Sequence, residues 1–466
     1  MSTGRILRQT TSRRDGYAPL RSYAAIGDGR TVALIADDAT IDWLAVPNLD
    51  SPSVFAALLD ARRGGSFVLT PTVGHEVTRR YLPRTNVLET TFSTETGVVR
   101  VLDAMTMRGG GLGPFRELQR RVKGISGRVP MSWCVRPRFG YGQRPTQLAR
   151  REGLPVAFSG SDAFVVRSFE AGTDEVDAHT IRGSFETSAG SSSLIALCAA
   201  HQEPLLFPTR GELDARFEQT VAAWERWAET RTYTGPWGHA VIRSALALKL
   251  LVHAPSGAVA AAATTSLPEQ LGGERNWDYR FSWVRDSAFT LAALLRLGCA
   301  PEAHAYFWWL SHATQLTHPR LQPLYRLDGG AHAPERTLPL DGYRGSRPVR
   351  IGNAAGGQLQ LDIYGELLET AWLYAQGGGE LDPGIGRRLA KTADLVCRIW
   401  REPDAGIWEV RSKPAQFTQS KMMCWVALDR AARLADRGLI PGHHRRRWGE
   451  HAAAIADFVE RRCFSP

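Results

Sequence analysis

The sequence predicts a multidomain protein of the β + α class, in which an antiparallel β-sandwich precedes a helical domain. Short apolar runs separated by Gly- and Asp-containing turns recur from about residue 20 to residue 200, which is typical of a sandwich. From residue 237 onward, the apolar residues recur at helical spacing instead. The chain has 466 residues, of which 43% are hydrophobic and 22% are charged, as in a globular protein of two or three domains.

The first half is predicted to form paired strands. Residues 30–35 and 40–46 flank a turn at Asp37-Asp38-Ala39, as expected for a hairpin. The other β-rich runs lie near residues 87–92, 98–102, 133–139, 163–169, 180–187 and 194–199. We therefore assign residues 1–205 to a β-sandwich domain.

A helix over residues 211–230 is predicted to link the two halves, within a linker of residues 206–236. Its apolar positions Leu213, Phe217, Val221 and Trp224 recur at helical spacing. Residues 237–466 form the predicted helical domain. Its helices are expected at 237–253, 286–298, 301–317, 358–377, 383–400, 418–436 and 443–461. Short turns alternate there with long loops at 254–285 and 318–357, which indicates a solenoid or closed toroid with its site in the long loops.

Charge and targeting signals argue against several classes of function. The formal net charge is +10, but the basic residues are spread along the whole chain, so we expect no nucleic-acid partner. No apolar run is long enough to predict a transmembrane helix, and the basic first 16 residues lack the apolar stretch of a secretion signal. The six cysteines contain no CxxC pair and are interpreted as reduced thiols. We expect a cytoplasmic protein without a membrane partner.

The sequence also lacks the motifs of cofactor and metal chemistry. It contains no Walker loop, GxGxxG, HExxH, GxSxG or zinc-spaced cluster of Cys and His. We therefore expect no metal and no organic cofactor.

The segment 274–286 is the first candidate site. Aromatic residues at 277, 279, 281 and 283 alternate with polar ones, so the segment offers rings for a sugar face and charged groups for its hydroxyls. The alternative is an extended strand with an aromatic core face, followed by Asp286 as the N-cap of the next helix. The two interpretations are compatible.

Glu409 follows Trp408 in a short apolar stretch and is the second candidate. Such surroundings disfavour the anion, so we expect a raised pKa that suits a general acid. The alternative is a glutamate on the open face of a strand, paired with Arg411.

Two further groups are weaker candidates. Asp362 and Glu366 lie four residues apart near Glu369, so they share a helix face that could bind sugar or a cation, or could be a solvated acidic face. Arg344, Arg347 and Arg350 lie in one long loop and could reach hydroxyls, carboxylates or phosphate, or could belong to an ordinary surface loop.

Three motifs together resemble glycoside hydrolase family 15, and within it the bacterial glucoamylase-like and trehalase branch. They are GERNWDYRFSWVRDS (273–287), QLDIYGELLET (360–370) and GIWEVRSKPAQFTQSKMMCWVALDRA (406–431). Residues 23–60 also resemble the start of that branch's β-sandwich. The resemblance implies a β-supersandwich, a linking helix and a catalytic (α/α)6 toroid of twelve helices.

The resemblance also implies an activity, the inverting hydrolysis of a terminal α-glucosidic bond in a small-molecule glucoside. Glu409 matches the general acid of the family. The residues expected to bind the substrate are Arg285 and Asp286, the aromatic walls Trp283 and Trp408, and the further pocket residues Trp277, Asp278, Asp362 and Arg350.

The family's general base, a glutamate in a late (A/S)-E-(E/Q)-Y-D-P motif, is not found before Pro466. Because only seven helices are predicted from residue 237 onward, we expect the toroid to be incomplete and the chain to be truncated. Trehalose and short α-glucans both remain open as substrates. The alternatives are a catalytically incomplete or sugar-binding remnant and an α-glucoside phosphorylase, in which the loop arginines would bind phosphate. Homo-oligomerisation also stays open.

Overall fold

The computed structural model describes residues 12–107 and 116–463, in two compact units. The first unit runs to Leu251 and includes Ala263–Trp277 and Thr337–Val349. The second unit contains Val252–Ala262, Asp278–Arg336 and the chain from Arg350 onward. Residues 1–11, which hold most of the basic N-terminal segment, lie outside the described residues.

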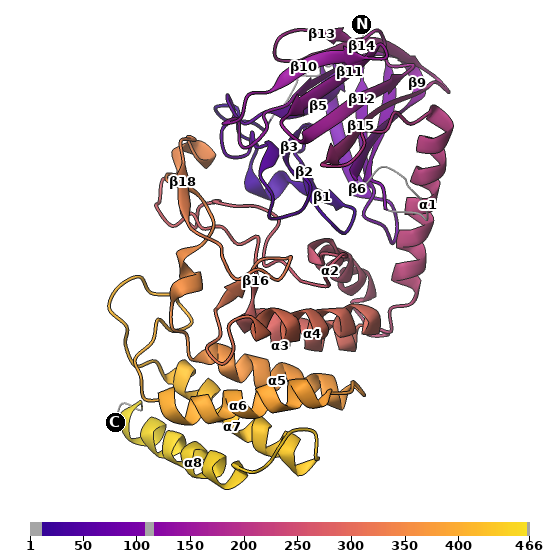
Figure 1. Ribbon diagram of the computed structural model, residues 1–466. Coiled ribbons are helices and arrows are strands. Elements are labelled where there is room, and N and C mark those ends of the chain that lie inside the picture. The colour runs from indigo at the N-terminus through magenta and orange to yellow at the C-terminus, as the bar shows by residue number, and fades with distance from the viewer. Residues whose placement is uncertain (1–11, 108–115, 464–466) are drawn as a thin grey trace, which may run out of the picture. The chain divides into compact units, whose positions relative to one another are not determined.

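The first unit is built on antiparallel strands, as the sequence predicted (Figure 1). Each predicted β-rich run coincides with a strand or part of one. The strands are β1 Ala24–Gly27, β2 Val32–Ile35, β3 Ile41–Ala45, β4 Ser53–Phe55, β5 Ser66–Pro71, β6 His75–Tyr81, β7 Leu88–Thr94, β8 Gly97–Met105, β9 Arg116–Arg136, β10 Gln147–Arg151, β11 Leu154–Ser159, β12 Asp162–Phe169, β13 Glu175–Val176, β14 Ile181–Ser188 and β15 Ser192–His201.

The long strand β9 joins the two layers of this sandwich. Its first part pairs with β8 and β15, and its second part pairs with β5 and β14. Side chains from both layers meet in one core, which includes Phe67, Phe92, Trp133 and Phe164. The sequence indicated only the end of β9, because the buried first part of the strand carries charged and polar residues and the middle of the strand is exposed.

Helix α1 (Arg210–Glu229) covers one sheet of the sandwich. Its buried residues are Leu213, Phe217, Thr220, Trp224 and Ala228. Thr220 therefore lies on the buried face where Val221 was predicted, and Val221 is only half-buried. The helix begins with a capping box between Thr209 and Glu212.

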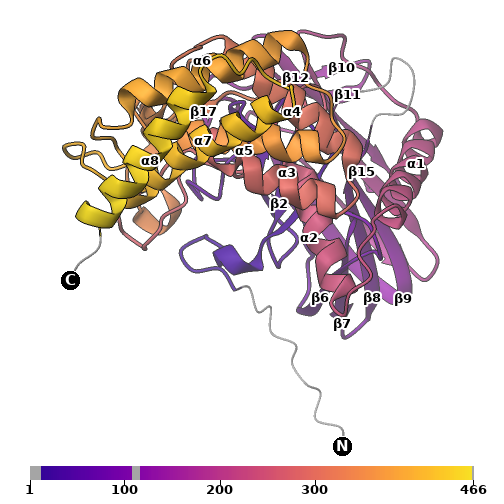
Figure 2. The same cartoon turned by 90° about the horizontal axis from the view of Figure 1, so that it is seen from below.

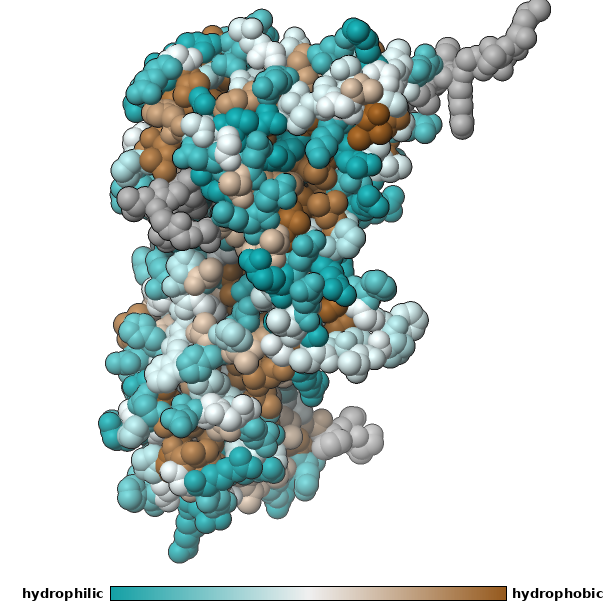
Figure 3. Space-filling model, turned by 90° about the vertical axis from the view of Figure 1, so that its right-hand side faces the viewer, coloured by the Kyte–Doolittle hydropathy of each residue, from teal (hydrophilic) through white to brown (hydrophobic). Residues whose placement is uncertain are grey.

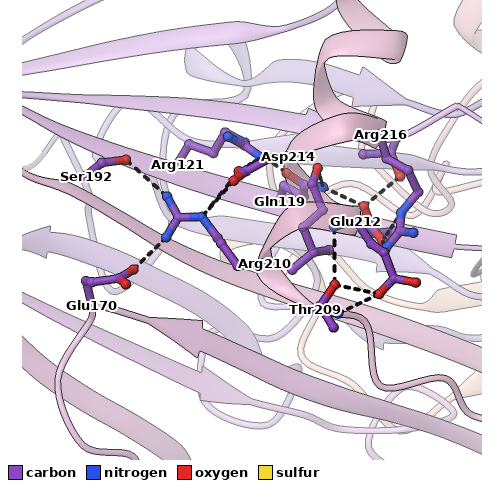
Figure 4. A network of polar contacts seen from close by, with 12 residues as sticks. Gln119, Arg121, Glu170, Ser192, Thr209, Arg210, Glu212, Asp214 and Arg216 are labelled. Carbon is purple, nitrogen blue, oxygen red and sulfur yellow. Dashed lines mark hydrogen bonds and ion pairs between the residues drawn. The ribbon is translucent and has the colours of Figure 1, made fainter.

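Ion pairs fix α1 to the strands beneath it (Figure 4). Arg210 binds Glu170 at 2.6 Å and Asp214 at 3.2 Å, and Asp214 also receives Arg121 at 2.6 Å. This helix is therefore part of the first unit. Helix α2 (Gly238–Leu251), which was predicted to begin the helical domain, also groups with the first unit.

The second unit contains, within the described residues, the six helices α3 Ser287–Arg296, α4 Ala300–Gln315, α5 Asp362–Gln376, α6 Pro383–Ile399, α7 Thr418–Asp436 and α8 Arg445–Arg462. Helix α5 packs against α3 and α7, and α7 packs against α8 (Figures 1 and 2). Gly365 allows the close approach of α5 to α7, because a Cβ there would lie 2.3 Å from the Met423 carbonyl oxygen. The short strands in the loops are β16 Ser282–Trp283, β17 Leu324–Tyr325, β18 Arg336–Leu338 and β19 Val349–Ile351.

The start of α5 differs from the prediction. The helix was expected from residue 358, but it begins at Asp362, and the Gln358–Leu361 segment that precedes it is not helical. This non-helical segment contributes to the site described below.

No helix in the described part of the chain is both long and apolar enough to span a membrane. On the face drawn in Figure 3, hydrophobic residues occur in separate patches among hydrophilic ones.

Candidate active site

Glu409 lies in a tight turn and not on a strand, so the alternative of a strand residue is wrong. The amide of Glu409 donates to Gly406 O at 3.1 Å, and that of Val410 donates to Ala405 O at 3.1 Å. Glu409 has a φ of 52° and Gly406 a φ of 64°, both in the left-handed region. The neighbouring Trp408 is 80% exposed.

The carboxylate of Glu409 is held by two donors. Its Oε1 accepts a hydrogen bond of 2.7 Å from Trp283 Nε1 and one of 3.1 Å from Arg285 Nη1. The apolar surroundings that the sequence suggested are therefore not found, because Trp408 points its ring to solvent and the carboxylate meets an indole and a guanidinium. The predicted motifs at 273–287 and 406–431 meet at this carboxylate.

Arg285 is the centre of the cluster. Its Nε donates to Asp362 Oδ2 at 2.7 Å, and its Nη2 donates to Gln360 Oε1. Burial alone would lower the pKa of Arg285, but the charges of Asp362 and Glu409 outweigh it and raise that pKa. The guanidinium thus stays charged and binds three partners at once.

Asp362 differs from the expectation that it lines a sugar pocket. It is the first residue of α5 and is completely buried, with its Oδ2 on Arg285. Because the Asp362 side chain is inaccessible, Asp362 contributes to the site by holding Arg285. The alternative of a solvated acidic face is also wrong, since Glu366 is buried as well.

Two glutamines complete the cluster, and sequence reasoning missed both. Gln360 Nε2 donates to Gln358 Oε1 at 2.9 Å, and Gln358 Nε2 donates to the main-chain carbonyls of Glu409 and Val410 at 3.3 Å. A closed circuit of hydrogen bonds therefore runs from Arg285 through the glutamines to Glu409 and back. Their position close to Asp362 in the QLQLD run was the only sequence feature that pointed to them. Glutamine side chains are uncharged, so they were not chosen as candidate site residues.

Two carboxyl groups near this circuit have raised pKa values. Desolvation raises the pKa of Asp286, and Glu409 and Asp362 add to the rise while Arg285 opposes it, although the side chain stays accessible to solvent. Asp286 occupies the N-cap position of α3, as the alternative predicted, but its side chain makes no capping hydrogen bond. Burial raises the pKa of Glu366 to about 8, with the charges of Asp362 and Glu369 adding to the effect.

Some aromatic residues of the first motif are buried in a core and another is exposed. Phe281 and Trp283 are buried in a small core cluster with Leu324 and Ala355, as the core alternative predicted. Tyr279 lies 5.3 Å from Trp283 between ring centroids and is itself exposed. The segment therefore combines a core face with polar contacts to Glu409.

The remaining predicted residues are not brought into this cluster. Asp278 is completely buried, and its carboxylate binds Arg280 at 2.7 Å and the amide of Gly352 at 3.0 Å, which makes it a support for the chain and not an accessible ligand-binding group. Trp277 belongs to the first unit.

Two of the three predicted loop arginines, Arg347 and Arg350, bind carboxylates, and Arg344 is exposed. Arg350 lies 3.5 Å from Glu335, which also receives Arg411 at 2.6 Å. The predicted alternative pairing of Arg411 with Glu409 is therefore replaced by Glu335. Arg347 pairs with Asp341 in the first unit. Among the described residues, no group of three or more His, Cys, Asp or Glu side chains could hold a metal ion.

Comparison with known proteins identifies relatives that cover most of the chain. A family model described as glycosyl hydrolases family 15 matches residues 235–466, and one described as trehalase-like, N-terminal, matches residues 9–181. The chain is 35% identical to a protein named trehalase from Mycobacterium tuberculosis, over 96% of this chain and 68% of that protein. It is also 35% identical to a trehalase from Thermoplasma volcanium, over 91% of this chain and 68% of that protein.

One solved structure, titled putative kojibiose phosphorylase from human microbiome, aligns with a TM-score of 0.46 and 7% identity, over 94% of this chain and 67% of the other. A similarity this low carries no argument about function.

Proposed function

Because the chain belongs to glycoside hydrolase family 15, we propose that this hydrolase cleaves the α-glucosidic bond of trehalose, with inversion at the anomeric carbon and Glu409 as the proton donor. The relatives named trehalase support the choice of sugar. The observation that carries the proposal is the paired contact of Trp283 and Arg285 with one oxygen of Glu409.

This contact gives the two carboxylate oxygens different roles. Oε1 accepts from both donors, so Oε2 is the oxygen that carries the proton to the glycosidic oxygen. As the C–O bond breaks, that proton passes to the leaving glucose, while a water molecule adds to the anomeric carbon from the opposite face and loses a proton. In an inverting enzyme a second carboxylate accepts that proton, at roughly 6.5–9.5 Å from the acid.

The same cluster supplies groups for a glucose ring. Asp286 is accessible and makes no capping bond, so its carboxyl group is available for the sugar hydroxyls. The exposed rings of Trp408 and Tyr279 offer apolar surface to a sugar face. Each of the three nitrogens of Arg285 donates to one partner, Asp362, Gln360 or Glu409, so the guanidinium is held in place beside Glu409.

The phosphorylase alternative draws no support from Arg347 and Arg350, two of the three loop arginines. Arg347 binds Asp341, and Arg350 and Arg411 share Glu335. Two of the three loop arginines therefore already bind carboxylates of the protein, while the third, Arg344, is exposed, so the phosphate arm of the test below decides this alternative.

The test is a proton NMR time course with the purified protein and trehalose, maltose or maltotriose, with and without inorganic phosphate. We expect free glucose from trehalose, with α- and β-glucose released in equal amounts before mutarotation. Release of α-glucose alone would contradict inversion, and preference for maltose or maltotriose would contradict trehalose as the substrate. Phosphate-dependent glucose 1-phosphate would establish a phosphorylase, and trehalose binding without turnover would establish a sugar-binding protein.

Glu409→Gln tests the assigned residue. It keeps an acceptor for Trp283 and Arg285 but cannot donate a proton as an acid, so we expect trehalose turnover to fall by about 10²–10⁴-fold with binding preserved. Glu402→Gln changes a glutamate seven residues earlier and serves as the control. Near-normal turnover of Glu409→Gln would remove Glu409 from this role.

A further inference from the structure

Glu409 belongs to a loop whose two ends are paired. We define the Glu409 loop as residues 404–415. At its base, the amide of Asp404 donates to Ala415 O at 2.9 Å, and the amide of Ala415 donates to Asp404 O at 3.0 Å. The turn that contains Glu409 therefore projects from a closed base, and the position of that base decides where the carboxylate lies.

A single side chain ties this base to two helices. Asp404 is completely buried, and its Oδ2 accepts from the amide of Leu361 at 2.9 Å and from the hydroxyl of Ser420 at 2.8 Å. Leu361 immediately precedes α5, and Ser420 lies in the first turn of α7. The unpaired amides and the dipole at a helix N-terminus favour a carboxylate, so both helix starts hold Asp404 in place.

The loop needs such an anchor because its turn is strained. Glu409 has a φ of 52°, and a non-glycine residue in this region costs roughly 1–2 kcal/mol. Strained conformations persist only where the surrounding structure holds them. A second main-chain bond, from Ala405 N to Leu359 O at 2.9 Å, continues the attachment from Asp404 towards the turn.

We propose that Asp404 is a positioning residue for the reaction: it fixes the Glu409 loop against the starts of α5 and α7, and so places the Glu409 carboxylate at the glycosidic oxygen. Asp404 itself contacts neither Glu409 nor the substrate; it acts through the main chain between residues 404 and 409. The proposal rests on the proposed role of Glu409 as proton donor. Since displacement of a catalytic group by 1 Å can cost about 10²-fold in rate, loss of this anchor is expected to be measurable.

The experiment compares two substrates that differ in their need for an acid. Trehalose requires protonation of its leaving oxygen, whereas α-glucosyl fluoride releases fluoride ion without a proton from Glu409. Asp404→Asn keeps one acceptor oxygen but loses the charge, and we expect kcat on trehalose to fall by about 10–10²-fold while kcat on the fluoride falls less than about threefold. The KM for trehalose should stay within about threefold.

Two further variants keep the test decisive. Ser420→Ala removes one donor to Asp404, so kcat on trehalose should again fall more than kcat on the fluoride. The decrease in log kcat on trehalose should be about a third of that for Asp404→Asn. This variant keeps the test available if Asp404→Asn folds poorly. Asp382→Asn is the matched control, because Asp382 caps α6 through Gly384 and Ile385 and does not touch the Glu409 loop. Asp382→Asn should lower the melting temperature without changing the ratio of kcat on trehalose to kcat on the fluoride.

The outcomes separate the two proposals. If Glu409→Gln is inactive on trehalose but Asp404→Asn and Ser420→Ala behave like Asp382→Asn, the positioning role is overturned and the acid assignment stands. If kcat of Asp404→Asn falls equally on both substrates, the role of Asp404 is structural and the proposal is again overturned. If Glu409→Gln keeps normal turnover, the proposed function itself is wrong.

Discussion

Trp283 donates a hydrogen bond of 2.7 Å from its indole nitrogen to Oε1 of Glu409, although 126 residues separate them in the chain. Trp283 is buried and lies in the short strand β16, so the indole is a fixed donor. The bond joins the motifs at 273–287 and 406–431. The sequence suggested a function for each motif but did not show that the two are in contact.

Removal of this indole donor should lower activity without unfolding the protein. Trp283→Phe keeps an aromatic ring in the core but loses the bond to Glu409. A hydrogen bond to a charged group contributes about 1.5–3 kcal/mol, so we expect kcat to fall by about 10–100-fold in steady-state assays. The control is Trp309→Phe, because Trp309 is also buried but its Nε1 meets no acceptor in the described parts of the chain. Equal activities of the two variants would contradict a role for the indole bond.

Arg285 should not tolerate lysine. Its planar guanidinium binds Asp362, Gln360 and Glu409 together, and a single ammonium group cannot reproduce that fork. We expect Arg285→Lys to lose about 10²-fold or more in kcat/KM, measured by glucose release. Arg326→Lys, at a half-exposed pair with Asp328, should retain wild-type kinetics. Turnover of Arg285→Lys within threefold of wild type would show that one cation suffices.

Lys421 should contribute mainly to stability. It is completely buried, and its Nζ donates to the carbonyls of Trp400 at 2.8 Å and Glu402 at 2.7 Å, which follow the end of α6. Lys421→Met preserves the apolar volume but leaves both carbonyls unpaired, so we expect the free energy of unfolding to fall by about 2–4 kcal/mol in urea titrations. Lys391→Met, on the exposed side of α6, should change it by less than about 0.5 kcal/mol. Similar losses in the two variants would contradict this account.

Glu366 should make stability depend on pH. Burial raises its pKa to about 8, so the folded protein holds this proton between the unfolded pKa and pH 8 while the unfolded chain releases it. Stability therefore falls as the pH rises through that window, with a slope of about 1.4 kcal/mol per pH unit from this one group.

Glu366→Gln stays neutral at every pH, so its unfolding free energy should lose that slope between pH 5 and pH 8. Glu450→Gln, on the exposed surface of α8, should keep the wild-type slope. Parallel curves for wild type and Glu366→Gln would show that Glu366 does not titrate in this window.

The overall fold was accessible from the sequence because periodicity reports burial. The short apolar runs that predicted strands such as β2 and β12 carry buried side chains, and the buried residues of α7 recur at helical spacing, so the structure confirms these elements. The extent of β9 was missed because its first part buries charged and polar residues such as Arg116, Glu117 and Arg120, which do not form an apolar run. The half-buried position of Val221 beside buried Thr220 shows that periodicity fixes a helix face only to within one residue.

The candidate site was only partly accessible. Trp283, Arg285 and Glu409 were singled out by the motifs that resemble the family, and the structure brings them together. Gln358, Gln360 and Asp404 were not identified, because their importance lies in contacts across the chain and not in their own chemistry. The surroundings of Glu409 were misjudged for a related reason: the ring of Trp408, its neighbour in sequence, is exposed and does not bury the Glu409 carboxylate.

At residue 409, the backbone conformation of the tight turn and the chemistry of the site favour different residue types. With a φ of 52°, the main chain at residue 409 suits glycine or asparagine, while Trp283 and Arg285 offset the strain by binding the long carboxylate that only glutamate brings to them. A stability-guided redesign that scores backbone compatibility would therefore recommend replacing Glu409. Efforts to make this hydrolase more heat-resistant should hold residue 409 fixed and work on the two sheets of the sandwich or on the outer helix α8 instead.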